Sequence, residues 1–392
     1  MTKKLIYMDN AATTRMNDQV LKAMLPYFTE EFGNPSSLYT FAGEAKNAVD
    51  HAREQVATAI GAEPSEIYFT ASGTEADNWA IKGTAFANCK KGKHIITSTI
   101  EHHAIINTMK FLEGQGFEIT YLPVNEDGLV SVEDLKKAIR PDTILVTIMF
   151  ANNEIGTIEP IEELSAVCKE RGVYFHTDAV QAVGHVRIDV KKMNIDMLSS
   201  SAHKFYGPKG VGFLYVRKGV RLSNFVDGGG QERSKRGGTE NVAGIVGLGK
   251  AIQVVYENFD EKIARITSLR DKLIAGIEKN ISYIRLNGPR ENRLCNNVNF
   301  SFSYVEGESI LLWLDLAGIA ASSGSACASG SLDPSHVLLG IGLPAETAHG
   351  SVRLTLGEYS TEEEVDYVLV KLKETIEKLR KMSPLFEGVE GR

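Results

Sequence analysis

Two periods of apolar residues alternate between about residues 66 and 217. Short β-rich runs are followed by segments in which apolar residues recur at helical spacing. The expected strands are 67–70, 94–100, 118–124, 143–152, 173–178, 197–200 and 211–216. The expected helices between them include 74–87, 104–113, 132–139 and 161–171. This alternation predicts an α/β fold, with a mainly parallel seven-stranded sheet and helices on both of its faces.

Two features refine the predicted sheet. The run ILVTIMF at 144–150 is apolar throughout, as expected of a strand that is buried on both sides. The last two expected strands follow each other through Gly-rich sequence without an intervening helix. We therefore expect one antiparallel pairing in the sheet.

Beyond residue 258 the pattern changes. A helical apolar period covers 263–277, and the strand-like run VNFSF follows at 298–302. Near the end, Thr361 and Glu364 have capping-box spacing and precede a long apolar helical face. We expect a large α/β domain of residues 16–258, and a smaller α+β domain of residues 1–15 and 259–392.

Composition and charge exclude several classes of protein. Hydrophobic residues make up 43% of the 392 residues, and 43 Lys and Arg face 50 Asp and Glu, for a net charge of −7. The chain lacks the sustained run of basic residues that is typical of a nucleic-acid-binding protein. No apolar stretch approaches the ~20 residues of a membrane helix. Four widely spaced cysteines indicate a reducing compartment and a cytoplasmic location. We interpret Cys89, Cys168 and Cys295 as small buried side chains.

Polar clusters follow three of the expected strands, where α/β sheets bind their ligands. Gly73 and Thr74 lie between a strand and a helix, so that backbone N–H groups can face an anion such as phosphate. Asp178 ends a second strand, and Gln181 stands three residues further on. Taken singly, these residues are as well explained by an ordinary helix cap and a loop cap.

The third cluster contains Ser201, His203 and Lys204 at another strand end. Alone, it is equally well explained by a solvated turn. Together, the three clusters supply an anion site, a carboxylate and an amine. These are the groups that pyridoxal phosphate requires, because the cofactor needs a lysine for its imine and an acid at its ring nitrogen.

Motifs along nearly the whole chain resemble one known family. They run from YMDNAATT at 7–14, through SSGSAC at 322–327, to RLTLG at 353–357. The chain is similar to the group I cysteine desulfurases, the NifS-like branch of the class V aminotransferase superfamily. This resemblance implies a fold type I pyridoxal-phosphate-dependent transferase.

The resemblance also implies roles for individual residues. Lys204 would form the Schiff base, His102 would stack on the ring, Asp178 would meet the ring nitrogen, and Gln181 the phenolic oxygen. The residues implied around the phosphate are Gly73, Thr74, Ser201 and His203, with Thr239 from the partner subunit of a homodimer. Asn153, also near the cofactor, and Arg353 would hold the substrate carboxylate.

Cys327 is the implied nucleophile. Its neighbours are Ser, Gly and Ala with no apolar period, which favours a loop over a core element. The resemblance implies that it takes sulfur from L-cysteine as a persulfide and leaves L-alanine, with His102 as an acid–base group. An iron–sulfur scaffold or another acceptor protein would then receive the sulfur. No resident metal is expected, and Cys327 would at most be a transient iron–sulfur ligand.

Other functions stay open at this point. The same scaffold could support a selenocysteine lyase or an aminotransferase, although a simple aminotransferase needs no thiol nucleophile. The chain could also be a catalytically silent partner in sulfur transfer. The residues do not decide between iron–sulfur assembly, nitrogenase maturation and tRNA thiolation as the destination of the sulfur.

Overall fold

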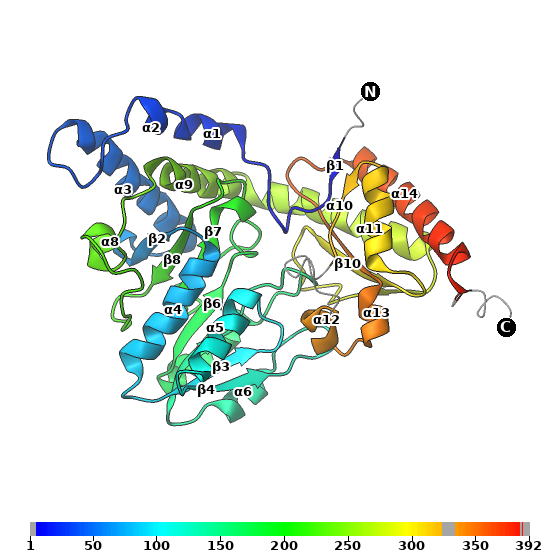
Figure 1. Cartoon of the computed structure of the whole chain (residues 1–392), viewed down its shortest axis with the longest axis horizontal. Coiled ribbons are helices and arrows are strands. Elements are labelled where there is room, and N and C mark those ends of the chain that lie inside the picture. Colours follow the sequence, from blue (N-terminus) through cyan, green and yellow to red (C-terminus); the bar gives the residue numbers. More distant parts are fainter. Residues whose placement is uncertain (1–4, 324–333, 385, 387–392) are drawn as a thin grey trace.

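A mixed sheet lies within the larger part of the protein, at the left in Figure 1. The computed structural model describes residues 5–323, 334–384 and 386. Within these residues the largest sheet has seven strands in the order β2-β8-β7-β6-β5-β3-β4. The strands are β2 (Ile67–Thr70), β3 (His94–Ser98), β4 (Glu118–Leu122), β5 (Thr143–Thr147), β6 (Tyr174–Asp178), β7 (Met197–Ser201) and β8 (Gly212–Val216). The expected fold class and sheet are thereby confirmed.

Strand β8 lies between β2 and β7 and is antiparallel to both. The sheet therefore has two antiparallel pairings, where the sequence suggested one. The expected strand at 143–152 was also too long, because β5 ends at Thr147. The apolar run continues as a buried connection in which Met149 and Phe150 are each 2% exposed. An apolar run alone does not distinguish such a connection from a strand.

Helices cover both faces of the sheet. In β8, Phe213 and Tyr215 face one apolar cluster while Leu214 faces another, as the two-residue period of a strand requires. The first cluster packs against α1 (Asp18–Met24), α3 (Phe41–Ile60), α6 (Val132–Ala138), α7 (Ile161–Arg171) and α9 (Val242–Tyr256). The second cluster packs against α4 (Gly73–Asn88) and α5 (His103–Glu113).

A separate apolar core lies among the C-terminal elements, coloured yellow to red in Figure 1. Ile6 and Met8 of the N-terminal arm belong to this core, and β1 (Ile6–Tyr7) pairs in parallel with β11 (Ile319–Ala320). The other elements are α10 (Phe259–Asn280), β9 (Ile284–Leu286), β10 (Asn297–Phe302), α11 (Gly307–Leu316), β12 (Ser351–Thr355) and α14 (Glu362–Lys381). The expected domain boundaries stay a prediction, which these separate cores support.

The remaining elements are short. They are α2 (Pro26–Thr29), η1 (Pro64–Glu66), η2 (Ala202–Lys204), α8 (Gln231–Ser234), α12 (His336–Gly340) and α13 (Ala345–His349). Val337 and Leu338 of α12 pack with Ile100, Met149 and Ile155 in a small apolar cluster. This cluster joins α12 to the connections that follow β3 and β5.

Three sequence-based details can be compared with the structure. Thr361 and Glu364 form the expected capping box at the start of α14. Cys168 and Cys295 are buried as expected, but the interpretation of Cys89 is wrong, because its side chain is exposed at the C-cap of α4. A residue at the C-cap lies beyond the packed face of its helix.

No helix within the described residues has both the length and the apolar character needed to cross a membrane.

Candidate active site

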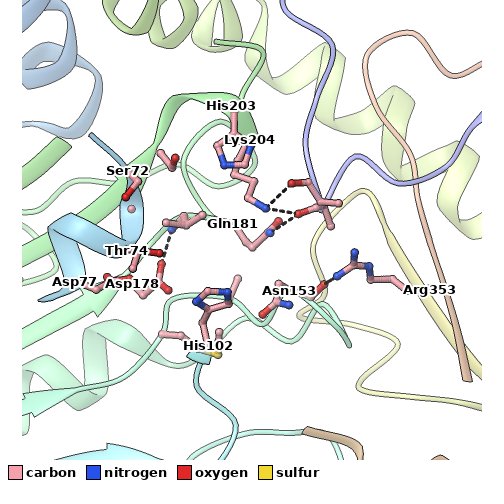
Figure 2. Close-up of a pocket in the computed structure, with 17 residues that line it drawn as sticks. Ser72, Thr74, Asp77, His102, Asn153, Asp178, Gln181, His203, Lys204 and Arg353 are labelled. Atoms are coloured by element: carbon pink, nitrogen blue, oxygen red, sulfur yellow. Dashed lines mark hydrogen bonds between the residues drawn. The ribbon is translucent and has the colours of Figure 1, made fainter. Parts of the chain in front are cut away.

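A cavity of about 260 Å³ lies where the carboxyl ends of β6 and β7 meet the N-terminus of α4. Figure 2 shows Thr74 and Asp178 on one side of it, Asn153 and Arg353 on the other, and His102 between them. The structure brings most of the predicted site residues together here: Gly73, Thr74, His102, Asn153, Asp178, Gln181, Ser201, His203, Lys204 and Arg353 all line the cavity.

The first turn of α4 is suited to an anion. Ser72 is the N-cap, and its Oγ accepts a hydrogen bond of 3.1 Å from the N–H of Glu75. The backbone of this 16-residue helix presents the positive end of its dipole to the cavity. A Cβ on Gly73 would lie 2.6 Å from Cγ2 of Val180, so only glycine fits without displacing that side chain.

Asp178 is a buried carboxyl group at the last position of β6, only 5% exposed. Its Oδ1 accepts a hydrogen bond of 2.9 Å from the N–H of Val180. Burial raises the pKa of Asp178 to about 6, against the opposing effects of the Val180 N–H and the Lys204 ammonium group. The group is therefore ionised at neutral pH and protonated in mild acid.

The N-terminal arm forms part of the wall around Lys204. Lys204 Nζ donates to the carbonyl oxygens of Ala11, at 2.7 Å, and Ala12, at 2.8 Å. Gln181 Nε2 also donates to the Ala11 carbonyl, at 2.9 Å. These bonds hold the Lys204 amine within the cavity, against the N-terminal arm (Figure 2).

His102 is neutral at working pH. Burial, and then the charges of Lys204 and His103, lower the pKa of His102 to about 4. It is the N-cap of α5, and its Nδ1 accepts a hydrogen bond of 3.1 Å from the N–H of Ala104. Because Nδ1 is an acceptor, the proton of the neutral ring is on Nε2.

Arg353 supplies a buried guanidinium group, 2% exposed. One terminal nitrogen donates to Asp9 Oδ1 at 3.0 Å and the other to the carbonyl of Asn153 at 2.9 Å. Nε of Arg353 has no hydrogen-bond partner among the described residues. The structure thus places a fixed positive charge across the cavity from Asp178 (Figure 2).

Two predicted residues are not among those that line this cavity within the described part of the chain. Thr239 lines a separate cavity of about 140 Å³, together with Glu232 and Arg236. Cys327 lies outside the described residues.

Sequence reasoning missed Asp77, which lines the main cavity although it is only 1% exposed. Burial and the charge of Asp178 raise the pKa of Asp77 well above its ordinary range. Its Oδ1 lies 3.8 Å from Nε2 of the buried His176. The sequence did contain a signal for Asp77, because it is an acidic residue between Ala76 and Trp79 on the apolar face of a helix, where acidic residues are rare. The carbonyl groups of Ala11 and Ala12 were also missed, because backbone acceptors leave no mark in the sequence.

Within residues 5–323, 334–384 and 386, no group of three or more His, Cys, Asp or Glu side chains is arranged to hold a metal ion.

Residues 6–368 match the family model described as Aminotransferase class-V, and the chain belongs to this family. It is 63% identical over 386 residues to "Cysteine desulfurase IscS" of Clostridium botulinum, an alignment that covers 98% of this chain and 97% of the relative. Among solved structures, a "NifS-like protein" is 40% identical with a TM-score of 0.90, covering 96% of this chain and all of the other. "SspA in complex with cysteine" is also 40% identical, with a TM-score of 0.79 and coverage of 92% and 100%.

Proposed function

We propose that the protein is a pyridoxal-phosphate-dependent cysteine desulfurase, which converts L-cysteine to L-alanine and carries the sulfur on Cys327 as a persulfide. The observation that carries this proposal is the meeting of Lys204, Asp178 and the N-terminus of α4 around one cavity. The near full-length relative named cysteine desulfurase supports the same reaction.

The residues around the cavity fit the proposed cofactor. The first turn of α4 and the side chains of Ser201 and His203 would hold its phosphate, and Asp178 its ring nitrogen. Lys204 would hold its aldehyde, while Gln181 and Asn153 would contact it from the side. Glycine at position 73 lets the start of α4 pack closely against Val180 and Ser201, which brings its first turn to the other residues of the cavity. When bound, pyridoxal phosphate withdraws electrons from the α-carbon of an amino acid.

Arg353 and Asn153 are the proposed residues for the substrate carboxylate. A guanidinium group binds a carboxylate through two parallel hydrogen bonds, and each terminal nitrogen of Arg353 keeps a second N–H besides the one donated to Asn153 or Asp9. The similar structure whose title names bound cysteine supports this substrate.

Proton and sulfur transfer are assigned to three side chains. Lys204 Nζ would remove the proton from the α-carbon, and neutral His102 would hold or exchange a proton near the substrate thiol. The thiolate of Cys327 would attack the substrate sulfur, forming an S–S bond as the C–S bond breaks. In this balance, L-cysteine and the Cys327 thiol give L-alanine and the Cys327 persulfide, with no external oxidant.

We also propose a homodimer in which Thr239 completes the cofactor site of the partner subunit. Between residues 21 and 41, large apolar side chains are exposed on α1, α2, the connections that follow them and the start of α3: Leu21, Leu25, Phe28, Phe32, Leu38, Tyr39 and Phe41. An apolar surface of this kind is typical of a protein interface. Size measurement in solution would test the dimer.

The sulfur acceptor and the location are proposals as well. The resemblance favours delivery to an iron–sulfur scaffold protein in the cytoplasm. Cys89, Cys168 and Cys295 are free thiols, which suits a reducing compartment. Incubation of the sulfur-loaded protein with purified candidate acceptors would identify which one takes up the sulfur.

The reaction is tested with Cys327→Ser, using Cys89→Ser as the matched control because Cys89 is an exposed thiol away from the cavity. With L-cysteine, the first variant should form no persulfide and no sulfide but keep the absorbance of the bound cofactor. The control should behave as wild type. Full sulfide production by Cys327→Ser would contradict the proposed nucleophile, and amino transfer to a keto acid without sulfide would favour an aminotransferase.

A further inference from the structure

Two buried serines flank the sequence that contains Cys327. Ser322 stands five residues before it (327 − 322) and Ser335 eight residues after it (335 − 327), and each is 5% exposed. At ~3.6 Å per residue, these separations limit the distance of Cys327 to about 18 Å from Ser322 and about 29 Å from Ser335. The contacts of the two serines therefore bear on where the thiol can act.

Ser322 is tied to the residue proposed to hold the substrate carboxylate. The backbone N–H of Arg353 donates to the carbonyl of Ser322 at 2.7 Å, and the N–H of Ser322 donates back to the carbonyl of Arg353 at 3.2 Å. This short antiparallel bridge places one end of the Cys327 sequence beside Arg353.

Ser335 is tied to the opposite side of the same region. Its Oγ accepts hydrogen bonds from the N–H groups of Val337 and Leu338, which caps α12. Its hydroxyl proton is donated to Oε2 of Glu154. A hydroxyl group has one proton, so this bond uses the whole donor capacity of Ser335.

The carboxyl group of Glu154 is not needed to shape its own turn. The carbonyl of Glu154 accepts hydrogen bonds from the side chains of Asn297, at 3.1 Å, and Asn299, at 2.9 Å. Its N–H donates to Oδ1 of Asn152 at 2.8 Å. The turn is thus held through its backbone, yet the side chain is 95% buried, which is costly for a carboxyl group unless it has a specific partner.

His336 makes a second connection from the start of α12. Its Nε2 lies 2.9 Å from the carbonyl oxygen of Glu101, and its ring packs edge-on against His103 with the ring centroids 4.9 Å apart. These two partners flank His102 in the sequence. Ser335 therefore contacts the turn that carries Asn153, and His336 contacts the segment that carries His102.

We propose that Ser335 and Glu154 are positioning residues for sulfur transfer. Their hydrogen bond ties Ser335, eight residues after Cys327, to the turn that carries Asn153, and we expect this anchor to favour the approach of the thiol to the substrate. This inference rests on the proposed desulfurase function, and it adds residues that touch neither cofactor nor substrate.

The test compares Ser335→Ala with Ser335→Thr in the full-length holoenzyme. Two quantities are measured: the rate of persulfide formation on Cys327 with L-cysteine, and the binding of L-alanine, followed by the absorbance change of the cofactor. Ser335→Ala should slow persulfide formation about fivefold, the effect of one lost hydrogen bond, while L-alanine binding is unchanged. Ser335→Thr, which keeps a hydroxyl donor, should restore most of the rate.

Ser131→Ala is the matched control, because Ser131 caps α6 through the N–H of Asp134 and does not line the cavity. It should lower the melting temperature without changing persulfide formation, although by less than Ser335→Ala, because both variants lose a helix cap but only Ser335→Ala also leaves the buried Glu154 carboxyl without its partner. An unchanged rate in Ser335→Ala, or a parallel loss of L-alanine binding and persulfide formation, would overturn the proposal. If the wild-type protein forms no persulfide at all, the proposed function fails and this inference fails with it.

Discussion

Two walls of the candidate site differ in how they are built. The cofactor wall, defined as Gly73, Thr74, Asp178, Ser201 and Lys204, comes from strand ends and helix starts of one sheet. The substrate wall, defined as Asp9, Asn153 and Arg353, joins the N-terminal arm, a turn after β5 and a strand of another sheet. The first wall is positioned by one sheet and the helix that packs on it, whereas the second depends on contacts between this sheet and the C-terminal core.

This difference predicts which property of the enzyme a substitution in each wall will change. Asp178 and Ser201 end neighbouring strands, β6 and β7, whose backbone pairing holds them in register. Arg353, in contrast, is oriented by Asp9 and by the carbonyl of Asn153, 344 and 200 residues away in the chain. We expect changes in the cofactor wall to affect cofactor chemistry, and changes in the substrate wall or its supports to affect mainly the Michaelis constant.

The largest effect is expected in the cofactor wall, for Lys204→Ala. Loss of the proposed covalent anchor and base should lower turnover on the order of 10³-fold. Steady-state assay of alanine formation measures this, and mass spectrometry after borohydride reduction should find no cofactor attached to the variant. Covalently attached cofactor in the reduced variant would show that another lysine holds it.

The next largest effect is expected in the substrate wall. Arg353→Lys keeps the positive charge but loses the planar pair of donors, so the Michaelis constant for L-cysteine should rise about 10- to 100-fold. Cofactor affinity, measured by titration of the apo-protein, should stay unchanged. An equal loss of cofactor affinity would mean that the two walls are not separate.

The pH dependence of cofactor binding should sharpen the assignment of Asp178. Its pKa is raised to about 6, so it becomes protonated as the pH falls below 6 and can no longer pair with a protonated ring nitrogen. Cofactor affinity should then decrease by up to about tenfold per pH unit. The cofactor phosphate also titrates near pH 6, so Asp178→Asn serves as the reference. This variant should bind the cofactor more weakly, and its cofactor affinity should fall less steeply as the pH decreases below 6. Identical pH profiles for the two proteins would contradict the role of Asp178.

The smallest effect is expected for a support of the substrate wall. Asn299→Ala removes the hydrogen bond to the carbonyl of Glu154 while Asn297 keeps its own. The Michaelis constant for L-cysteine should rise about twofold to fivefold, with turnover little changed. Asn88→Ala, which removes a buried side-chain hydrogen bond to Thr84 far from the cavity, should destabilise the fold and leave the Michaelis constant unaltered. A similar rise in both variants would indicate general loosening of the protein.

Much of the cofactor wall could be predicted from the sequence because its signals are local. Helical and strand periods located β6, β7 and α4, and strand ends of an α/β sheet are where ligands bind. Asp178 and Lys204 could therefore be assigned to one site from the sequence, and both line the same cavity. The capping box at Thr361 and Glu364 was recognised for the same reason, since both partners lie within one turn.

The substrate wall and its supports were less accessible to such reasoning. Arg353 was identified only through a family resemblance, and its contacts with Asp9 and Asn153 are contacts between distant segments. The same holds for the bond of Lys204 to Ala11 and for the bond of Ser335 to Glu154. Local sequence determined the elements of this protein and the chemistry at their ends, because helix hydrogen bonds, helix caps and the apolar period of a helix or strand all act over a few residues. Tertiary structure alone decided which ends face one another, because that depends on how the separate apolar cores pack together.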